Sequence, residues 1–378
     1  MGKYKLINNV LGWIVFAIAS TVYLMTMEPT ASFWDCGEFI SSAYKLEVGH
    51  PPGAPFFMLT ANLFTQLASD PSTVAKMVNT MSALFSGLTI LFLFWSITHL
   101  ARKIMVKDGE EASLGQMITV MGSGLVGALA YTFSDTFWFS AVEGEVYAYS
   151  SLFTAVVFWL ILKWEAVADK PHADRWIVLI AYLMGLSIGV HLLNLLCIPA
   201  IVLVYYYKKF PNPTMKGTLV ALLASFAIVA LMMYGVVQGL VEVCGYFELL
   251  FVNVLGMPYN SGVFAYVIIV AGVLIWSIWE TMRDEIHPTR MKIAFILSVV
   301  LIGIPFIGSG YVLAVILTAA LSLYLFKSKK VDIKTLNTIL VCLMVVVVGY
   351  SSYALTLIRA TADTPMNQNA PSDIFTLR

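Results

Sequence analysis

Two carboxylates and a histidine lie close together in a polar stretch of this otherwise apolar sequence. Asp35 and Glu38 are three residues apart, and His50 precedes a Pro-Pro-Gly break at 51–53. If residues 33–47 form a helix, both acids lie at the edge of its apolar stripe, where burial raises a carboxyl pKa toward that of a useful general base. Proline disfavours a helical residue before it, so the break predicts a turn that brings His50 back toward this helix. The structural alternative is that Asp35 caps the helix.

A second set of acids lies among aromatic residues in the segment 134–150. Glu143 and Glu145 have Tyr147 and several other aromatic residues close by in the sequence. Aromatic residues next to a membrane usually form an interfacial belt, whereas acids are costly there unless they have a function. Carboxylates among aromatic rings suit the hydroxyls and ring faces of a sugar. We therefore predict that the two acids bind a substrate.

Three polar residues at the ends of later apolar segments complete the candidates. His191 and Asn194 belong to a short stretch between two apolar runs, where they either line a pocket or form hydrogen bonds between helices. Arg359 follows the last apolar run and suits a phosphate leaving group, although an interfacial anchor explains it nearly as well.

The composition indicates a membrane protein. Of the 378 residues, 60% are hydrophobic and 12% are charged, against about 25% charged in soluble domains. The formal net charge is zero, so nothing in it points to nucleic acid as a partner. Four scattered cysteines predict neither a disulfide framework nor a zinc site. The signatures of P-loop, GxGxxG, HExxH and GxSxG proteins do not occur in a credible context, which argues against nucleotide-powered transport and common hydrolases. We expect no metal site.

The apolar runs predict an all-α polytopic protein with about eleven transmembrane helices. They lie near residues 7–25, 77–101, 116–134, 148–168, 175–190, 192–207, 217–240, 262–281, 291–308, 310–326 and 335–357. The pair 175–190 and 192–207 is short and forms either a hairpin or one broken helix. With a cytoplasmic N-terminus, eighteen of the 22 Lys and Arg residues fall on the cytoplasmic side, as the positive-inside rule requires.

This topology places residues 26–76 in a long first loop outside the cytoplasm. The apolar run 54–67 is too short to span a membrane and predicts an interfacial helix. The helix predicted over 33–47 would likewise lie flat on the membrane, with its apolar stripe facing the lipid. We expect a transmembrane domain over 1–358, with 26–76 as its catalytic loop. Residues 359–378 would begin an outer tail that leads to a soluble domain.

With these residues in place, the sequence resembles a family of multi-spanning bacterial membrane proteins long filed as a domain of unknown function. That family is related to an animal protein O-mannosyltransferase that modifies plexin-type receptor domains. The matching stretches include FWDCGEFISSAYKLEVGHPPGAPFF (33–57), FSAVEGEVYAYSSLFTAVVFWLILKWE (139–165), GLSIGVHLLNLLCIPAIVLVYYYKK (185–209) and IRATADTPMNQNAPSDIF (358–375).

The resemblance implies a GT-C glycosyltransferase. Together with the charge count, it leads us to expect a protein of the bacterial inner membrane with its active site and C-terminus on the periplasmic side. Asp35 would be the general base, with Glu38 beside it, and the division of labour between them stays open. The donor would be a polyprenyl-phosphate sugar, expected to be mannose, and the acceptor a Ser or Thr of an exported protein. No cofactor is expected; a divalent metal would be needed only for a diphosphate donor. The expected substrate-binding residues are His50, Glu143, Glu145, Tyr147, His191, Asn194 and Arg359.

Two other classes of function are compatible with parts of the sequence. A transporter or flippase of lipid-linked sugars or small solutes would need polar residues deep in the spans, whereas the charges lie at helix ends and in loops. A non-catalytic membrane scaffold would leave the paired acids unexplained.

Overall fold

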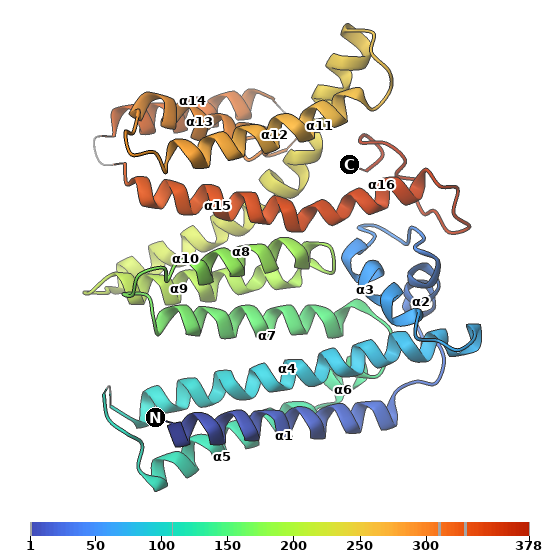
Figure 1. The fold of residues 1–378 in the computed structure, drawn as a ribbon, viewed down its shortest axis with the longest axis vertical. Coiled ribbons are helices and arrows are strands. Elements are labelled where there is room, and N and C mark those ends of the chain that lie inside the picture. The colour runs from blue at the N-terminus through green and yellow to red at the C-terminus, as the bar shows by residue number, and fades with distance from the viewer. Residues whose placement is uncertain (1, 108, 309–310, 329–330, 378) are drawn as a thin grey trace.

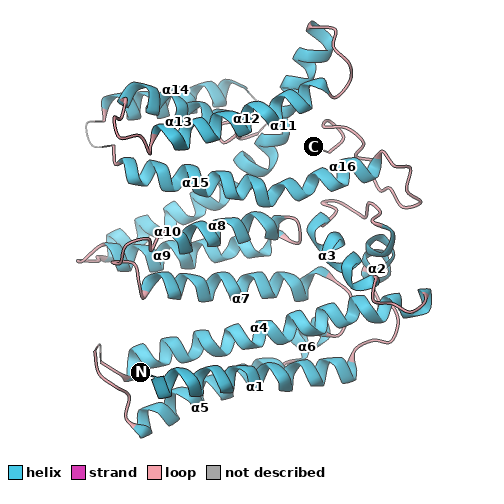
Figure 2. Cartoon of the chain, in the orientation of Figure 1, coloured by secondary structure: helices cyan, strands magenta, loops and turns pink. Residues whose placement is uncertain are grey.

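The chain forms a layered bundle of roughly antiparallel helices (Figure 1). A computed structural model describes residues 2–377 apart from 108, 309–310 and 329–330. Helices make up almost all of the regular structure in these residues (Figure 2). The α-helices are α1 Gly2–Thr26, α2 Cys36–Lys45, α3 Pro55–Thr65, α4 Val74–Met105, α5 Leu114–Thr132, α6 Asp135–Ala141, α7 Val146–Glu165, α8 Arg175–Ile188, α9 Ile198–Lys209, α10 Met215–Ala230, α11 Gly239–Leu249, α12 Ser261–Glu280, α13 Pro288–Leu301, α14 Tyr311–Lys327, α15 Ile333–Tyr350 and α16 Ala354–Ala360.

Eight helical stretches among the described residues are long and apolar enough to cross a membrane. They are Gly2–Thr26, Pro71–Met105, Leu114–Thr132, Val146–Glu165, Leu192–Lys209, Met215–Val254, Ser261–Glu280 and Ile333–Ala360. Each coincides with one of the eleven expected spans. The other three expected spans coincide with the shorter helices α8, α13 and α14. The prediction of an all-α polytopic membrane protein is therefore confirmed. The segment 175–207 is two helical pieces, because a turn at 189–191 separates α8 from the 3-10 helix Leu192–Cys197 and α9.

The two ends of the bundle differ in character. At one end, which we call the loop end, lie the connection 27–73 with α2 and α3, the segment 133–145 with α6, and the segment 354–377 with α16 (Figure 1). The opposite end, which we call the basic end, carries the start of α1 and the last turns of α4, α7 and α9, with basic residues in each of these last turns. This segregation agrees with the charge pattern of the sequence.

The connection 27–73 folds as part of the protein core. Cys36, Phe39 and Ile40 of α2 are buried, and the last two pack with Phe57 of α3 and Val78 of α4 in one apolar cluster. The helix expected over 33–47 is thus shorter, and most of its apolar stripe faces other helices instead of lipid. The run 54–67 does form the expected short helix, α3, and a proline at its first position favours that start. Because α2 packs on α3 and α4, the acids at its beginning have a fixed position.

Candidate active site at the loop end

The first group of polar side chains consists of Asp35, Glu38 and His50, which offer oxygen and nitrogen atoms within 4.8 Å of one another. Glu38 Oε1 accepts a hydrogen bond from the backbone N–H of His50 at 2.5 Å and lies 3.0 Å from His50 Nδ1. The expectation that the turn brings His50 back toward the helix is therefore confirmed. Asp35 is exposed and occupies the N-cap position of α2, where the structural alternative placed it, but its side chain makes no capping hydrogen bond.

Local backbone geometry fixes this arrangement. The N–H of Gly53 donates to the carbonyl of His50 at 2.8 Å, which closes the turn. Gly49 lies against the Glu38 carboxylate, and a Cβ at this position would come within 2.7 Å of Glu38 Oε1. Only glycine allows the carboxylate so close to the backbone here. The pairing of Glu38 with His50 thus depends on the residue before the histidine.

The second group comes from the segment between α6 and α7. Atoms of Cys36, Glu143 and Glu145 that could bind a metal ion lie within 4.8 Å of one another. Gly144 passes close to α2 and α4: a Cβ there would come within 2.9 Å of Asn79 Oδ1 and 3.0 Å of a methylene of Ile40. A side chain at this position would push the two acids away from α2.

A buried asparagine forms hydrogen bonds to the first loop. Asn79, on α4, donates from its amide to the backbone oxygens of Glu28 at 2.7 Å and Thr30 at 3.0 Å. The N–H of Glu28 in turn donates to the carbonyl of Val142 at 3.0 Å. These bonds connect the first loop, the core helix α4 and the segment that carries Glu143.

Burial and like charges alter the acidity of the second group. Burial raises the pKa of the Glu143 carboxyl, although hydrogen bonds from Ser32 and Cys36 oppose the rise. Burial, with Glu143 and Glu145 close by, raises the pKa of the Cys36 thiol to about 12, so this cysteine is a neutral hydrogen-bond donor. Burial raises the pKa of Glu145 to about 7, and the charges of Glu143 and Asp35 add to the rise.

The two groups form one acidic cluster, which we define as Asp35, Glu38, His50, Glu143 and Glu145. Asp35 is next in sequence to Cys36, whose thiol belongs to the second group. The charge of Asp35 raises the pKa of Glu145, and that of His50 lowers it. Residues about 110 positions apart in the sequence therefore meet at one place. Two carboxylates at close range cannot easily both be ionised, so one holds a proton while its neighbour is free to accept one.

Tyr147, two residues after Glu145 in the sequence, lies next to His191, whereas Asn194 is internal. Tyr147 is exposed, and its ring centroid lies 5.5 Å from that of His191. His191 Nδ1 accepts from the N–H of Leu193 at 3.1 Å and so caps the following 3-10 helix. Asn194 is fully buried and donates to Ser187 Oγ at 3.0 Å. Tyr147 and His191 are thus accessible to a ligand, and Asn194 joins two helical segments.

Arg359 lies at the far end of α2 from the acids. Its Nε donates to the carbonyl of Leu46 at 2.6 Å, and its Nη2 to that of Lys45 at 3.1 Å. The ten residues of α2 span about 15 Å, so these bonds lie one helix length from Asp35. In this position the guanidinium stabilises the C-terminus of α2, and its expected contact with a leaving phosphate stays a prediction. Free carbonyls there attract a cation.

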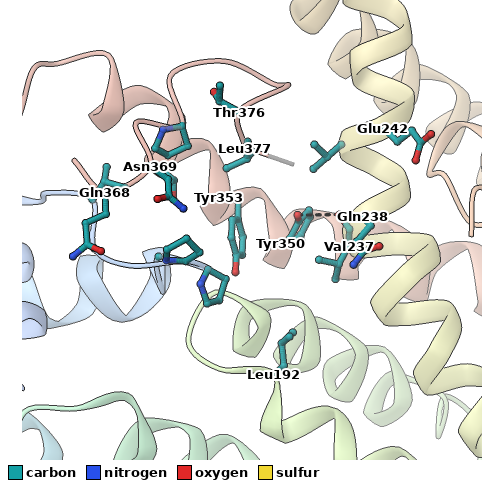
Figure 3. Close-up of a pocket in the computed structure, with 18 of the residues that line it drawn as sticks. Leu192, Val237, Gln238, Glu242, Tyr350, Tyr353, Gln368, Asn369, Thr376 and Leu377 are labelled. Atoms are coloured by element: carbon teal, nitrogen blue, oxygen red, sulfur yellow. Dashed lines mark hydrogen bonds between the residues drawn. The ribbon is translucent and has the colours of Figure 1, made fainter. Parts of the chain in front are cut away.

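A cavity of about 640 Å³ lies next to the turn that follows Gly49. Figure 3 shows Val237, Gln238 and Glu242 on one wall, Tyr350 and Tyr353 on another, and Gln368 and Asn369 of the C-terminal segment nearby. The Tyr350 hydroxyl donates to the carbonyl of Val237 at 3.1 Å. The C-terminal segment is held against the first loop by a parallel bridge between Val48 and Asn367. Such a volume is ample for a small polar ligand.

Sequence reasoning missed several contributors to this region. Cys36 and Asn79 support the acids from buried positions. The position of Cys36 directly after Asp35 in the sequence could have indicated its role. The amides of Gln238, Gln368 and Asn369 come from segments far from the acidic loops in the sequence. No local pattern marks them.

Comparison with known proteins points to one family. Residues 35–214 match the family model described as the protein O-mannosyl-transferase TMEM260 N-terminal domain. The chain is 28% identical over 174 residues to the mouse protein O-mannosyl-transferase TMEM260, covering 46% of this chain and 22% of that one. It is 25% identical over 187 residues to the Dictyostelium discoideum protein of the same name, covering 48% of this chain and 21% of that one.

The match spans about a fifth of the length of these curated relatives. No solved structure matches the chain significantly. The matched region contains the whole acidic cluster, together with Tyr147, His191 and Asn194. Residues 35–214 are thus similar to the N-terminal domain of the TMEM260 protein O-mannosyl-transferases, in agreement with the resemblance seen in the sequence.

Proposed function

We propose that this protein is a membrane glycosyltransferase of the GT-C type that moves a sugar, expected to be mannose, from a polyprenyl-phosphate donor to a Ser or Thr hydroxyl of an exported protein. The observation that carries the proposal is that two separate loops meet at one end of the bundle: Glu143 and Glu145 offer atoms within 4.8 Å of the thiol of Cys36, the residue next to Asp35. Support for the reaction class comes from the curated relatives, which are named protein O-mannosyl-transferases.

The base in this proposal is Asp35. It is exposed at the beginning of α2, where an incoming hydroxyl can reach it. Glu145 nearby has a pKa raised to about 7 and so holds a proton for part of the time near neutral pH. A protonated Glu145 adds no negative charge next to Asp35, the proton acceptor of the proposed step. Glu38 is engaged with His50 and has a positioning role.

The proposed step is a single inverting displacement. Asp35 takes the proton of the acceptor hydroxyl, whose oxygen attacks the anomeric carbon of the sugar. The carbon–oxygen bond to the donor phosphate breaks, and the electron pair leaves with the phosphate on the lipid. The new glycosidic bond has the opposite anomeric configuration. The step changes no oxidation state and therefore needs no oxidant or reductant.

The loop end offers a suitable place for both substrates. A lipid-linked donor presents its sugar at the membrane surface, and the acidic cluster lies at the ends of the spanning helices α1, α4 and α7. The cavity next to Gly49 has amide and hydroxyl groups that suit sugar hydroxyls. Tyr147, two residues after Glu145, and His191 form a pair of accessible rings, and rings of this kind pack on sugar faces.

The displacement requires no cofactor for a monophosphate donor. Asp35, Glu38 and His50 have the ligand types and the spacing to hold a divalent cation, as do Cys36, Glu143 and Glu145. The first set would be the better one for Mg²⁺ or Mn²⁺, since it is more exposed and contains no thiol. A metal there would be expected only if the donor carries a diphosphate, whose charge a cation would neutralise.

The proposal is tested by Asp35→Asn in the full-length protein. Purified protein is mixed with polyprenyl-phosphate mannose that carries a radiolabel and with exported acceptor protein, and label in the acceptor is counted. Loss of the base should lower transfer about 10²–10⁴-fold. Asp135→Asn is the matched control, because Asp135 is an exposed acid at the start of α6, outside the cluster.

Three results would contradict parts of the proposal. Transfer at the wild-type rate by the Asp35 variant would refute this residue as the base. Transfer from a nucleotide-linked sugar in preference to the lipid-linked one would refute the donor class. Retention of the donor's anomeric configuration in the product would refute the single displacement.

A further inference from the structure

A second cavity, of about 350 Å³, lies at the basic end of the bundle, opposite the acidic cluster. It is enclosed by the beginning of α1 and the last turns of α4 and α7. The 25 residues of α1 span about 37 Å, so this cavity lies roughly one membrane thickness from the loop end. The proposed transfer reaction makes no use of it.

The residues that line this cavity bring several positive charges together. They include Lys5 of α1, Arg102 of α4 and Lys163 of α7, and no described lining residue is an Asp or Glu. A carboxylate near this end, Glu165, forms an ion pair with Lys103, which does not line the cavity. The cavity therefore carries an excess of positive charge that the protein itself does not neutralise.

Aromatic rings hold two of these cations in place. The guanidinium of Arg102 lies 4.8 Å from the centre of the Tyr4 ring, and Lys163 Nζ lies 4.6 Å from that of Trp159. A cation over an aromatic face keeps its full charge and its hydrogen-bond donors. Such contacts position the two side chains and leave their charges available to an anion.

Unsatisfied hydrogen-bond donors and acceptors give a second, independent indication of a ligand. Arg102 Nε and Asn8 Oδ1 are buried and have no hydrogen-bond partner among the described residues, although both residues line the cavity. A buried donor without an acceptor costs about 1–3 kcal/mol, so such groups usually have a partner. A ligand with acceptor oxygens would satisfy the guanidinium N–H. Arginine is well suited to phosphate oxygens in particular.

We propose that this cavity binds the phosphate group of an anionic membrane lipid. The spanning helix α1 begins here and α4 and α7 end here, so the cavity lies at the depth of the lipid headgroups. Trp95 and Trp159 also line the cavity, and tryptophan is enriched at that depth. Basic pockets between membrane helices are a recurrent form of lipid headgroup site. The occupant is thus a lipid of the surrounding membrane, with its acyl chains along the helices.

The test measures lipid binding to the intact protein by native mass spectrometry from nanodiscs of phosphatidylcholine with phosphatidylglycerol. The double variant Arg102→Gln, Lys163→Gln removes two cations of the cavity. Each cation near a membrane surface contributes about fivefold in affinity, so retention of phosphatidylglycerol should fall roughly 25-fold. The control Lys107→Gln, Lys170→Gln removes the same charge from exposed positions at the same end and should retain the lipid.

A charge-preserving variant separates binding from folding. Arg102→Lys with Lys163→Arg keeps both cations and should retain most of the lipid, even if packing is disturbed. Equal phosphatidylglycerol retention by the cavity variant and the control variant would overturn the proposal. If inorganic phosphate stabilises the detergent-solubilised protein through Arg102 and Lys163 while phosphatidylglycerol does not, the site binds a free anion and the lipid assignment is overturned.

Discussion

Replacing Glu145 with glutamine should make the stability of this protein less sensitive to pH. Burial and the neighbouring acids raise the pKa of Glu145 from about 4.5 to about 7 in the folded protein. A carboxyl whose pKa is raised by folding binds a proton more tightly in the folded state than in the unfolded state. Its contribution to stability is fully present below pH 4.5 and is lost as the pH rises through 7. A glutamine side chain carries no charge at any pH, so the variant lacks this loss.

The size of the effect follows from the shift in pKa. The difference between about 4.5 and about 7 sets a ceiling of about 3 kcal/mol. Glu145 is only partly buried, so solvent screens its charge, and we reduce the expected effect to about 1 kcal/mol. For a chain of this length, 1 kcal/mol corresponds to about 1–2 °C in the midpoint of thermal unfolding.

The assay compares unfolding midpoints of wild type and variant in one detergent at pH 5 and at pH 8, at a fixed heating rate. The variant should gain about 1–2 °C on wild type between the two pH values. Glu110→Gln, in an exposed loop at the basic end, serves as control and should follow wild type at both pH values. A gain of the same size in the control, or no gain in the Glu145 variant, would refute the idea that Glu145 is forced to hold a proton.

Three further changes test α2 and the residues that contact it. Gly49→Ala should lower the unfolding free energy by about 1–3 kcal/mol, because its Cβ would push the Glu38 carboxylate away from the backbone N–H of His50; a chemical denaturation curve equal to that of wild type would contradict this. Arg359→Gln should lower the free energy of unfolding by about 1.5–3 kcal/mol, because the charged hydrogen bond to the Leu46 carbonyl is lost. An unchanged denaturation curve would show that this hydrogen bond makes no net contribution to stability. Cys36, with its pKa raised to about 12 by burial, should resist a maleimide at pH 8 when it is the only cysteine in the folded protein, and react after denaturation; rapid labelling before denaturation would show an accessible thiol.

Much of the fold could be predicted because membrane helices have a strong local signal. Runs of about 20 apolar residues identify spans without knowledge of their partners. The first loop was harder to interpret. An apolar stripe on a short helix suits a membrane surface and a protein core equally well, and only the position of α3 and α4 decides that Phe39 and Ile40 face the core. That choice depends on contacts between segments, which periodicity cannot reveal.

In the candidate site, too, local features could be predicted from the sequence, whereas contacts between distant segments could not. The turn that brings His50 to Glu38 was predictable, since the prolines restrict the backbone locally. The role expected for Arg359 followed from charge alone, and charge does not reveal that the carbonyls at the end of α2 lie within reach of the guanidinium. The cavity residues Gln238 and Gln368 were beyond sequence reasoning, because nothing in the sequence near either one indicates that it lies beside the first loop.

The acidic cluster and the cavity next to Gly49 belong to different parts of the chain, and this separation bears on substrate choice. The acidic cluster lies wholly within residues 35–214, the region shared with the TMEM260 proteins. The cavity next to Gly49 is instead lined mostly by residues between 237 and 377, outside that region. A hydroxyl needs the same base whatever the acceptor, but a cavity must fit one ligand in particular. In the proposed transfer, changes at Gln238 or Asn369 should alter which sugar or acceptor is used, whereas changes at Asp35 should lower transfer about 10²–10⁴-fold with all of them.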